Sequence, residues 1–490
     1  EQWKSLMTPA IYPGADFDQI AWGLLSPQNY QNPTPQSRYH LVVVGAGPAG
    51  LISAIGAAGL GAKVALIERH RMGGDCLNVG CMPSKALLAF TKRSDADFQQ
   101  AFTWLREVRA GIAPHDSVER YTEAGVDVFL GEASFNDAGE ICVDEQPLNA
   151  RRIALCTGAS AAVPPIPGLH EAQPLTNETV FDLTEPPASL AILGAGAIGC
   201  ELAQAFARLG VNVSLFELAE RVLPNETPLA SQAVTKALEA SGVDVYVGQG
   251  VQEIRGQGTV VCGAAEIHCE RVLVALGRKP NTQGLNLKAA GVELNAQGSV
   301  VTNAKLQTSN KRILAAGDCT AQLQFTHHAD AHARALIQNA LFAPTAKVSG
   351  LIVPHCTYTD PEVASVGAMP QTLSSAGATF DTFAFDLNDL DRSRADPKVK
   401  SGGIQHAEVY TQKGSDTILG ATIIGSDAGE LLAPICVMMS NGLGLSAAQK
   451  TIFSYPTRSE YLKRLGDAYN RSRMTPSVAK LFRWWLARTL

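Results

Sequence analysis

Long apolar runs and strong charge are both missing from this 490-residue sequence. No stretch approaches the ~20 consecutive apolar residues that a membrane-spanning helix needs, and no basic segment followed by an apolar one marks a secretory signal. We therefore expect a cytoplasmic location. The net charge of −6 argues against a nucleic-acid-binding protein, which is normally basic. With 46% hydrophobic and 18% charged residues, the composition excludes a disordered chain.

Cysteine is neither dense enough for a disulfide framework nor clustered as in a zinc array. Of the ten cysteines, Cys76 and Cys81 lie close together in the sequence. The other eight are scattered, and we expect them to be buried apolar side chains. They are Cys142, Cys156, Cys200, Cys262, Cys269, Cys319, Cys356 and Cys436.

Two segments of the sequence repeat each other at a constant offset of 149 residues. Residues 45–68 read GAGPAGLISAIGAAGLGAKVALIE, and residues 194–217 read GAGAIGCELAQAFARLGVNVSLFE. The three motif glycines, a Leu-Gly pair and the closing glutamate coincide, and an apolar run suited to a buried parallel strand precedes each copy. A single GxGxxG is a weak signal, but two copies in register predict two dinucleotide-binding βαβ units.

Each residue of such a unit has its own role. The first glycine makes a tight turn, the second lets the backbone approach a pyrophosphate, and the third lets the helix pack on the strand. The helix N-terminus offers free N–H groups to the phosphates, and the closing acid binds the adenosine ribose. We expect one flavin and one nicotinamide cofactor. Glu217 favours NADH, because a carboxylate repels the 2′-phosphate of NADPH, although Arg221 stands four residues further on.

The cysteine pair lies in GGDCLNVGCMPSKALL, residues 73–88, directly after the first copy. On an ideal helix the two Cα atoms would be about 8.6 Å apart, beyond the ~7 Å limit for a disulfide. A bridge therefore needs a distorted turn, which Gly80 and Pro83 permit. A nearby helix N-terminus would lower a thiolate pKa, as redox chemistry requires. Two buried thiols that never pair are the alternative at this point.

The segment GGDCLNVGCMPSKALL resembles the redox signature of the FAD-dependent pyridine nucleotide-disulfide oxidoreductases of class I. This family includes dihydrolipoamide dehydrogenase, glutathione reductase and mercuric reductase. The resemblance covers about residues 39–465, and GGDC with DLDRSRAD (389–396) is most similar to the mercuric-reductase branch. It continues through ALCTGAS (154–160), ALGRKPN (275–281), ILAAGDCT (313–320) and YTDPEVASVG (358–367).

The resemblance implies an α/β fold with two Rossmann-like dinucleotide-binding domains and a C-terminal α+β dimerisation domain. The FAD domain would come in two segments, 39–164 and 277–350, around an NAD(P) domain at 165–276. The interface domain would span 351–470, between an N-terminal arm (1–38) and an amphipathic tail (471–490). A homodimer is implied, in which each active site takes residues from both subunits.

The same resemblance implies the site residues. Cys76 would exchange with substrate, and Cys81 would be the charge-transfer thiol against the flavin. Lys85 would lie near the flavin and pair with Glu201. The FAD would be held by Gly45, Gly47, Gly50, Glu68, Gly74, Lys85, Thr157, Gly158, Asp318 and Ala329. The nicotinamide dinucleotide would be held by Gly194, Gly196, Gly199, Glu217 and Gly277.

The sequence departs from the thiol-reducing members near its end. Those enzymes carry His-Pro-Thr followed by Ser-Glu, with the histidine as the acid–base group and the glutamate orienting it. Here the segment is SYPTRSE (454–460), so Tyr455 stands at the histidine position and Glu460 is kept. A histidine pKa of about 6.5 suits proton transfer at neutral pH and a tyrosine pKa of about 10 does not. Tyr455 therefore counts against dihydrolipoamide or glutathione turnover. Mercuric reductases carry tyrosine there too; a plain packing residue is the alternative.

These patterns predict a flavoenzyme that passes electrons from NAD(P)H, with NADH preferred, through FAD to a Cys76–Cys81 disulfide and on to a disulfide or a soft metal ion. Mercuric ion reductase and a dihydrolipoamide dehydrogenase-like enzyme are the alternatives within the class. Two features argue against a mercuric ion reductase. Mercuric reductases typically end in a cysteine pair, whereas the last cysteine here is Cys436, and no N-terminal CxxC metal domain is found. A redox sensor or membrane-associated electron donor is the alternative outside the class.

Three patterns stand apart from the motifs. His328 and His332, in FTHHADAHA with His327, have the i, i+4 spacing of a helical metal pair, but no further ligand completes a zinc site, so we expect no metal and a helix beneath the flavin.

Residues 1–38 have little periodicity and predict an irregular arm. At the C-terminus, apolar residues recur at helical spacing with basic residues between them, which predicts a helix packed on the body or a partner subunit. Attachment to a membrane surface is the alternative for this helix. Its apolar residues are Val478, Leu481, Phe482, Trp485 and Leu486, and its basic residues are Lys480, Arg483 and Arg488.

Overall fold

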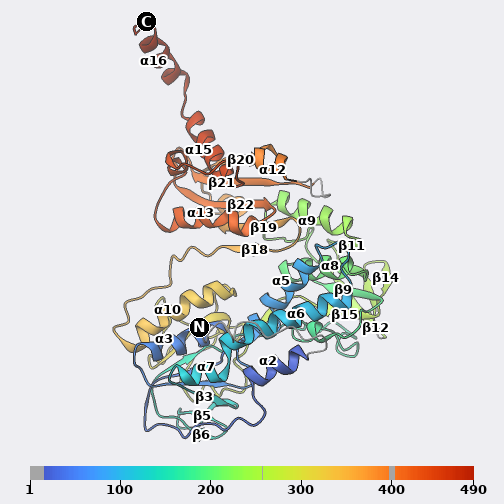
Figure 1. Ribbon diagram of the computed structural model, residues 1–490, viewed down its shortest axis with the longest axis vertical. Coiled ribbons are helices and arrows are strands. Elements are labelled where there is room, and N and C mark those ends of the chain that lie inside the picture. Colours follow the sequence, from blue (N-terminus) through green and yellow to red (C-terminus); the bar gives the residue numbers. More distant parts are fainter. Residues whose placement is uncertain (1–15, 257, 397–402, 490) are drawn as a thin grey trace, which may run out of the picture. The chain divides into compact units, whose positions relative to one another are not determined.

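The computed structural model describes residues 16–256, 258–396 and 403–489 (Figure 1). Contacts between Cα atoms divide the chain into two compact units. Of the described residues, the first unit takes those within 16–194, 205–214 and 251–350, and the second takes those within 195–204, 215–250 and 351–489. The domain boundaries expected from the sequence stay a prediction.

A five-stranded parallel sheet, in the order β17-β7-β1-β2-β3, forms the centre of the first unit. Apolar side chains of the central strand β1 (Tyr39–Val44) alternate between two cores: Leu41 and Val43 face one, and Val42 and Val44 face the other. The helices α3 (Pro48–Gly59) and α10 (Thr326–Leu341) pack against each other and contribute to the first core (Figure 1). Burial on both faces is what allows these strands to be continuous apolar runs.

The other strands of this sheet are β2 (Val64–Glu68), β3 (Val126–Leu130), β7 (Ala150–Leu155) and β17 (Ile313–Ala315). A small antiparallel sheet covers the second core with β4 (Ala133–Phe135), β5 (Ile141–Val143) and β6 (Gln146–Pro147). The remaining helices of this region are α2 (Phe17–Leu25), α4 (Gly74–Asn78), α5 (Cys81–Phe90), α6 (Phe98–Ile112) and α7 (Val118–Glu123). The strands β8 (Ala159–Ala161) and β16 (Arg278–Pro280) form a two-stranded antiparallel pair.

A second parallel sheet, ordered β11-β10-β9-β15, contains the strand that precedes the second sequence copy. Its strands are β9 (Ser189–Leu193), β10 (Asn212–Phe216), β11 (Val243–Tyr246) and β15 (Arg271–Val274). The helices α8 (Ala197–Arg208) and α9 (Pro228–Ala240) belong to the same stretch of chain. A three-stranded antiparallel sheet follows, with β12 (Val251–Arg255), β13 (Thr259–Cys262) and β14 (Ala265–His268). The repeat in the sequence thus corresponds to a repeat of strand–helix–strand structure.

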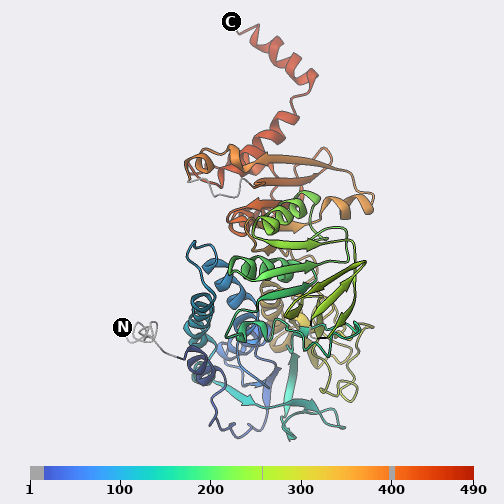
Figure 2. The same cartoon turned by 90° about the vertical axis from the view of Figure 1, so that its right-hand side faces the viewer.

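The C-terminal part of the second unit is an antiparallel sheet in the order β18-β19-β22-β21-β20, drawn as orange and red arrows in Figure 2. Helix α13 (Ala428–Ser440) packs on β19 and β22, and α15 (Glu460–Ser472) contacts β20. The strands are β18 (His355–Thr357), β19 (Glu362–Gly367), β20 (Phe380–Asp386), β21 (His406–Gln412) and β22 (Ile418–Gly425). The other helices are α11 (Pro370–Ser375), α12 (Asp391–Ala395), α14 (Ser446–Lys450) and α16 (Pro476–Leu486). The expected α/β fold with a C-terminal α+β domain is confirmed.

The chain ends differ from the sequence-based expectation. The N-terminal arm is not irregular throughout: residues 17–25 form α2, because Asp16 caps the helix by accepting the N–H of Gln19 and because Ala21 and Leu25 are buried. Residues 1–15 of the expected arm lie outside the described residues. The tail forms the expected helix α16, but no residue of α16 is buried by the described chain. Within the described ranges, no helix is both long and apolar enough to cross a bilayer.

Candidate functional site

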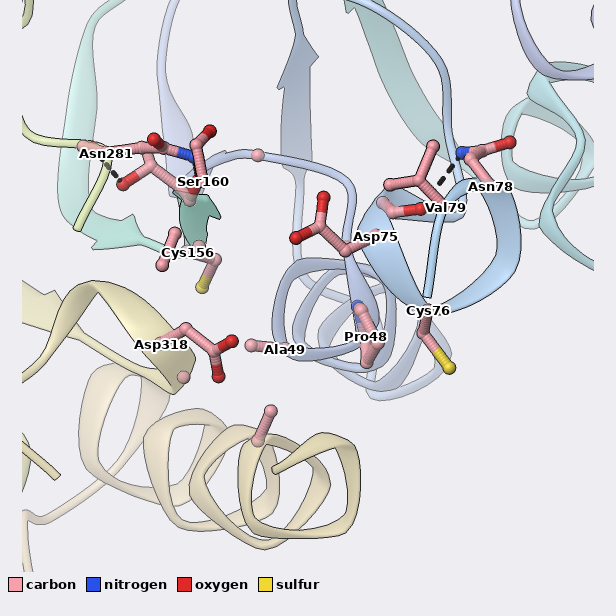
Figure 3. A pocket seen from close by; sticks show the side chains of 18 of the residues that line it. Pro48, Ala49, Asp75, Cys76, Asn78, Val79, Cys156, Ser160, Asn281 and Asp318 are labelled. Carbon is pink, nitrogen blue, oxygen red and sulfur yellow. Dashed lines mark hydrogen bonds between the residues drawn. The ribbon is translucent and has the colours of Figure 1, made fainter. Parts of the chain in front are cut away.

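A cavity of about 310 Å³ opens in the first unit beside the N-terminus of α3. Its walls come from loops at the carboxyl ends of β1, β2 and β7, the position at which parallel α/β sheets bind ligands. Figure 3 shows Cys156 and Asp318 on one side and Asp75 and Cys76 on the other. Eight of the predicted FAD residues line it: Gly45, Gly47, Glu68, Gly74, Thr157, Gly158, Asp318 and Ala329.

Glycines bring the backbone strands of this cavity closer together than any side chain would allow. Gly45 has φ +100°, and a Cβ there would lie 2.4 Å from the Cys156 carbonyl oxygen. A Cβ on Gly50 would lie 1.8 Å from the Gly45 oxygen, which is why Gly50 supports the turn without lining the cavity. A Cβ on Gly74 would lie 2.4 Å from the Cα of Gly47. The N-terminus of α3 is therefore left open to a ligand, with no side-chain cap on its first N–H groups.

The two sequence copies share their local geometry. Glu68 accepts the N–H of Ala46 at 2.7 Å, and Glu217 accepts the N–H of Ala195 at 2.8 Å. Gly194 has φ +102°, and a Cβ there would lie 2.5 Å from the Ala275 oxygen, as at Gly45. The closing acid of each copy therefore holds the turn that follows the first glycine. Burial raises the pKa of Glu68, while the N–H groups of Ala46 and His70 oppose the shift.

Three charged side chains meet in the cavity. Asp75 accepts a hydrogen bond from Arg278, which also donates to the Ala159 carbonyl. The Nε of Arg278 lies 3.7 Å from Asp318 and, among the described residues, has no hydrogen-bond partner. Burial raises the pKa of Asp318; Arg278 lowers it and Asp75 raises it further. The partly buried guanidinium of Arg278 thus lies between two acids, with a polar donor left over for a ligand.

These features fit an FAD molecule. Open N–H groups at a helix N-terminus suit its pyrophosphate, and the acid at the end of β2 is placed where a ribose hydroxyl donates. Glycines at 45, 47 and 74 keep the wall free of Cβ atoms that would fill the space. A cavity that also reaches Cys76 and Thr326 brings the same ligand close to a thiol.

The chain breaks between the two cysteines, as a close approach requires. Cys76 lies in α4, and Cys81 is the first residue of α5. Gly80, between them, has φ −137° and ψ −111°, and a Cβ there would lie 2.8 Å from the Asp75 oxygen. Cys81 therefore stands at the uncapped N-terminus of a ten-residue helix, where the helix dipole favours a thiolate.

Both cysteines are thiols in this structure, and Cys76 hydrogen-bonds Cys81. The Sγ of Cys81 also lies 3.3 Å from the Oγ1 of Thr326, at the start of α10. The pKa of Cys76 is raised, first by its hydrogen bond to Cys81 and then by burial. The Cys76 thiol therefore holds its proton more strongly than an ordinary cysteine does.

Tyr455 lies in the second unit on the loop before α15. Its ring is 69% exposed, and its hydroxyl donates to the Oδ2 of Asp391 at 3.0 Å. This hydrogen bond, followed by the carboxylate's negative charge, raises the pKa of Tyr455. Glu460 is 7% exposed and accepts from Arg464 at 2.9 Å. The tyrosine hydroxyl is thus held by the DLDRSRAD segment rather than by the glutamate.

The other predicted site residues are distributed over both units. Lys85 lies on α5 of the first unit, and Glu201 lies on α8 in the second unit, where it is buried and accepts the N–H of Tyr358 at 2.9 Å. Their pairing stays a prediction. Gly196 and Gly199 lie at the start of α8, and Gly277, with φ +104°, follows β15.

The histidines of FTHHADAHA have structural contacts. The Nδ1 of His328 lies 2.8 Å from the Leu323 oxygen, and the Nδ1 of His332 accepts the N–H of Gly317 at 3.4 Å. Burial, helped by the neighbouring His328, lowers the pKa of His332 to about 4. These contacts place the pair beside the loop that carries Asp318. Of the eight scattered cysteines, six are buried as expected, and Cys356 and Cys436 are partly exposed.

Sequence reasoning did not single out several residues that line the cavity, and three of them have contacts with the predicted site. Asp75, Arg278 and Thr326 all line the cavity. Asp75 and Arg278 stand inside two of the motifs quoted above, GGDC and ALGRKPN, and a charged residue within a motif was the available signal. Thr326 carried no signal, because its contact with Cys81 joins positions 245 residues apart.

A parallel nucleotide-binding fold with a dithiol beside its ligand cavity defines a flavin-type dithiol oxidoreductase. Residues 39–333 match the family "Pyridine nucleotide-disulphide oxidoreductase", and residues 353–465 match its dimerisation domain. The chain belongs to this family, class I, and is an FAD- and pyridine nucleotide-dependent oxidoreductase acting on a metal ion or a sulfur group.

Curated relatives extend over most of the chain. A mercuric reductase of Staphylococcus aureus is 34% identical over 448 residues, which cover 87% of this chain and 81% of that protein. A mercuric reductase of Streptomyces lividans is 30% identical and covers 90% of this chain and 98% of its own length. The likeness to the mercuric-reductase branch is confirmed.

Solved structures show the same fold. The Cu(II) complex of the HOCl-induced flavoprotein disulfide reductase RclA from Escherichia coli superposes with a TM-score of 0.80 at 28% identity, over 88% of this chain and all of that one. LpdA from Mycobacterium tuberculosis has a TM-score of 0.79 at 23% identity, over 89% of this chain and all of that one. The second comparison supports the fold alone.

Proposed function

We propose that the chain passes two electrons from NADH to a soft metal ion by way of the Cys76–Cys81 pair. One observation carries the proposal: the thiols are hydrogen-bonded to each other at the cavity, while the tyrosine at the family's acid–base position donates to Asp391. Bound FAD would supply two-electron transfer between the nicotinamide and the disulfide. The residues proposed to hold it are the eight that line the cavity, with Gly50 and Lys85.

The two cysteines would divide the work. Cys81, at the helix N-terminus, would carry the stable thiolate, and Cys76, with its raised pKa, would keep the proton until a substrate arrives. A soft ion prefers thiolate ligands, so its binding would displace that proton. Two thiolates would then form the disulfide, and the two electrons released would reduce a divalent ion such as Hg²⁺ to the metal.

Tyr455 favours a metal ion over a disulfide as the acceptor. A disulfide substrate leaves as a thiolate that must be protonated, whereas a reduced metal ion needs no proton from the enzyme. With its pKa raised by Asp391, Tyr455 is a poor proton donor at neutral pH. The relatives named mercuric reductase and the Cu(II) complex of RclA support the same class of acceptor.

An acceptor screen tests the proposal. Purified holoenzyme is given NADH with Hg²⁺, Cu²⁺, oxidised glutathione, oxidised lipoamide, quinones or O₂, and NADH oxidation is followed. We expect metal-dependent oxidation that Cys76→Ser abolishes. If NADH oxidation were faster with a disulfide than with any metal ion, the second candidate, a small-disulfide reductase, would be established instead. The retained, buried Glu460 supports this second candidate.

The proposed preference for NADH rests on Glu217 and Arg221. Both oxygens of Glu217 accept backbone N–H groups, from Ala195 and Ala219, so its charge is fixed in place. One terminal nitrogen of Arg221 donates to the carbonyl oxygens of Pro224 and Glu226, which holds the guanidinium against its own loop and would restrain it from reaching a 2′-phosphate. We expect kcat/KM for NADH to exceed that for NADPH, and a tenfold excess for NADPH would contradict this.

A homodimer is proposed as the working unit, because the chain carries the family's dimerisation domain. Tyr455 of one subunit would then serve the dithiol of the other.

A further inference from the structure

The C-terminal tail differs in charge from the rest of the chain. Asp467 is the last acid of the sequence, and residues 468–490 carry five cations. Much of this tail forms α16, which Thr475 caps by accepting the N–H of Val478 at 3.3 Å and which Pro476 begins. Local sequence signals alone therefore define an 11-residue helix.

The apolar side chains of α16 form one continuous face. At 100° per residue, an arc of about 140° holds Val478, Leu481, Phe482, Trp485 and Leu486. Four of these are large and exposed, with Leu481 at 57%, Phe482 at 50%, Trp485 at 61% and Leu486 at 60%. So much exposed apolar surface on one short helix indicates an interaction site.

The cations are arranged around that face. On the same helical projection, Arg483 and Arg488 flank the apolar arc on its two sides, and Lys480 lies opposite its centre. On this projection Trp484 lies about 60° outside the arc, and the guanidinium of Arg488 lies 3.7 Å from the centre of its ring. Apolar and aromatic side chains on one face, with cations on the other, are typical of helices that lie at the surface of a bilayer.

We propose that α16 binds the surface of an anionic lipid membrane, lying in its interface rather than crossing it. A lipid surface contacts both parts of the helix at once, since the acyl region takes the apolar arc and the anionic headgroups take the flanking arginines. A second copy of the chain packed on the arc would leave the cations on the far face without a partner. Charge complementarity therefore selects the lipid over a protein partner. This inference does not depend on the proposed electron acceptor.

The test is co-sedimentation of the full-length holoenzyme with vesicles. We expect binding to vesicles that contain phosphatidylglycerol, little binding to phosphatidylcholine alone, and release on raising the salt from about 0.1 M to about 1 M. Each of Arg483→Gln and Arg488→Gln should lower the partition constant about fivefold. NADH oxidation by the unbound variants serves as the control for folding.

A matched pair of variants separates charge from apolar contact. Trp485→Glu, in α16, and Ala487→Glu, at its C-cap, each add one negative charge, but only Trp485 lies on the apolar arc. We expect Trp485→Glu to abolish vesicle binding and Ala487→Glu to weaken it about fivefold, because the latter loses electrostatic attraction alone.

Three results would overturn the proposal. One is an absence of vesicle binding by the wild-type protein, and another is equal binding by the two glutamate variants. The third is a wild-type protein that does not bind vesicles and whose dimer dissociates when residues 477–490 are deleted. This result would assign α16 to a contact with a second copy of the chain.

Discussion

At the scale of single residues, the position of a proton decides what the dithiol can do. The pKa of Cys76 is raised because its thiol is hydrogen-bonded to Cys81 and partly buried, and Cys81 lies at the start of α5. An outer thiol and an inner charge-transfer thiol are the roles that the family resemblance implies, and they stay a prediction. Hydrogen bonding and helix position, rather than cysteine count, distinguish these two from the other eight.

The same scale governs Tyr455. Asp391 raises the pKa of its hydroxyl, so the tyrosinate forms only at high pH. Asp391→Asn keeps a hydrogen-bond acceptor but removes the charge, and the pKa of Tyr455 should fall toward its ordinary value of about 10. If the hydroxyl contacts the metal ion, the alkaline change in metal-dependent kcat/KM should move to lower pH, and Tyr455→Phe should lower kcat/KM about tenfold.

The control for this prediction is Asp389→Asn, two residues away. Asp389 pairs with Arg394 on the surface, at 3.1 Å, whereas the hydroxyl of Tyr455 donates to Asp391. Its variant should leave the pH profile unchanged. Equal shifts in both variants, or none in either, would show that Asp391 does not act through Tyr455.

At the scale of elements, α3 shows how a single atom can decide whether a nucleotide site forms. Gly50→Ala would place a Cβ 1.8 Å from the Gly45 oxygen, in a turn that must keep its shape. We expect this variant to lose bound FAD and about 3 kcal/mol of stability or more. Gly59→Ala, in the same helix with nothing within 4 Å, should instead stabilise the protein by up to about 1 kcal/mol.

Flavin absorbance and the thermal midpoint of the two α3 variants check this expectation. If Gly50→Ala retained FAD and had the thermal midpoint of the wild type, the turn could relax. The close approach of residue 50 to the Gly45 oxygen would then not be what builds the cavity.

Helix α10 supplies a prediction about acid. Burial lowers the pKa of His332 to about 4, whereas in the unfolded chain it is about 6.5. Between these values the unfolded state binds the extra proton, so folding stability falls as pH drops through this window, by up to roughly 3 kcal/mol. His332→Asn should flatten the dependence of the thermal midpoint on pH in this range, and the exposed His327→Asn should not. An unchanged slope in His332→Asn would rule out this titration as the cause.

Elements were the most predictable level. The repeat at offset 149 predicted two βαβ units, and both acids hold equivalent turns. Local signals also predicted α16, and Gly80, where the chain breaks, was one of two residues expected to permit a distorted turn. Contacts distant in sequence were not predictable: Arg278 meets Asp75 across 203 residues, and Tyr455 meets Asp391 across 64. Such pairs depend on how elements pack, which no periodicity records. The helix α2 was missed because a nine-residue element among prolines has too little pattern.

At the scale of the whole molecule, the proposed dimer makes a testable arrangement of sites. We consider mixed dimers that carry Cys76→Ser and Tyr455→Phe. If Tyr455 serves the partner's dithiol, placing the two changes on different subunits leaves one intact site and about half the metal-dependent activity. Placing both changes on one subunit leaves no intact site. The opposite pattern would mean that each subunit works alone.

The most direct test of the central claim, that Cys76 and Cys81 form the redox centre beside the flavin, is an anaerobic titration of the holoenzyme with NADH. We predict a long-wavelength absorption band from the Cys81 thiolate against the flavin in the wild type. The band should be lost in Cys81→Ser and present in Cys76→Ser even before NADH is added, because Cys81 then has no partner for a disulfide. A wild-type protein without the band, or a band that survives in Cys81→Ser, would contradict the account.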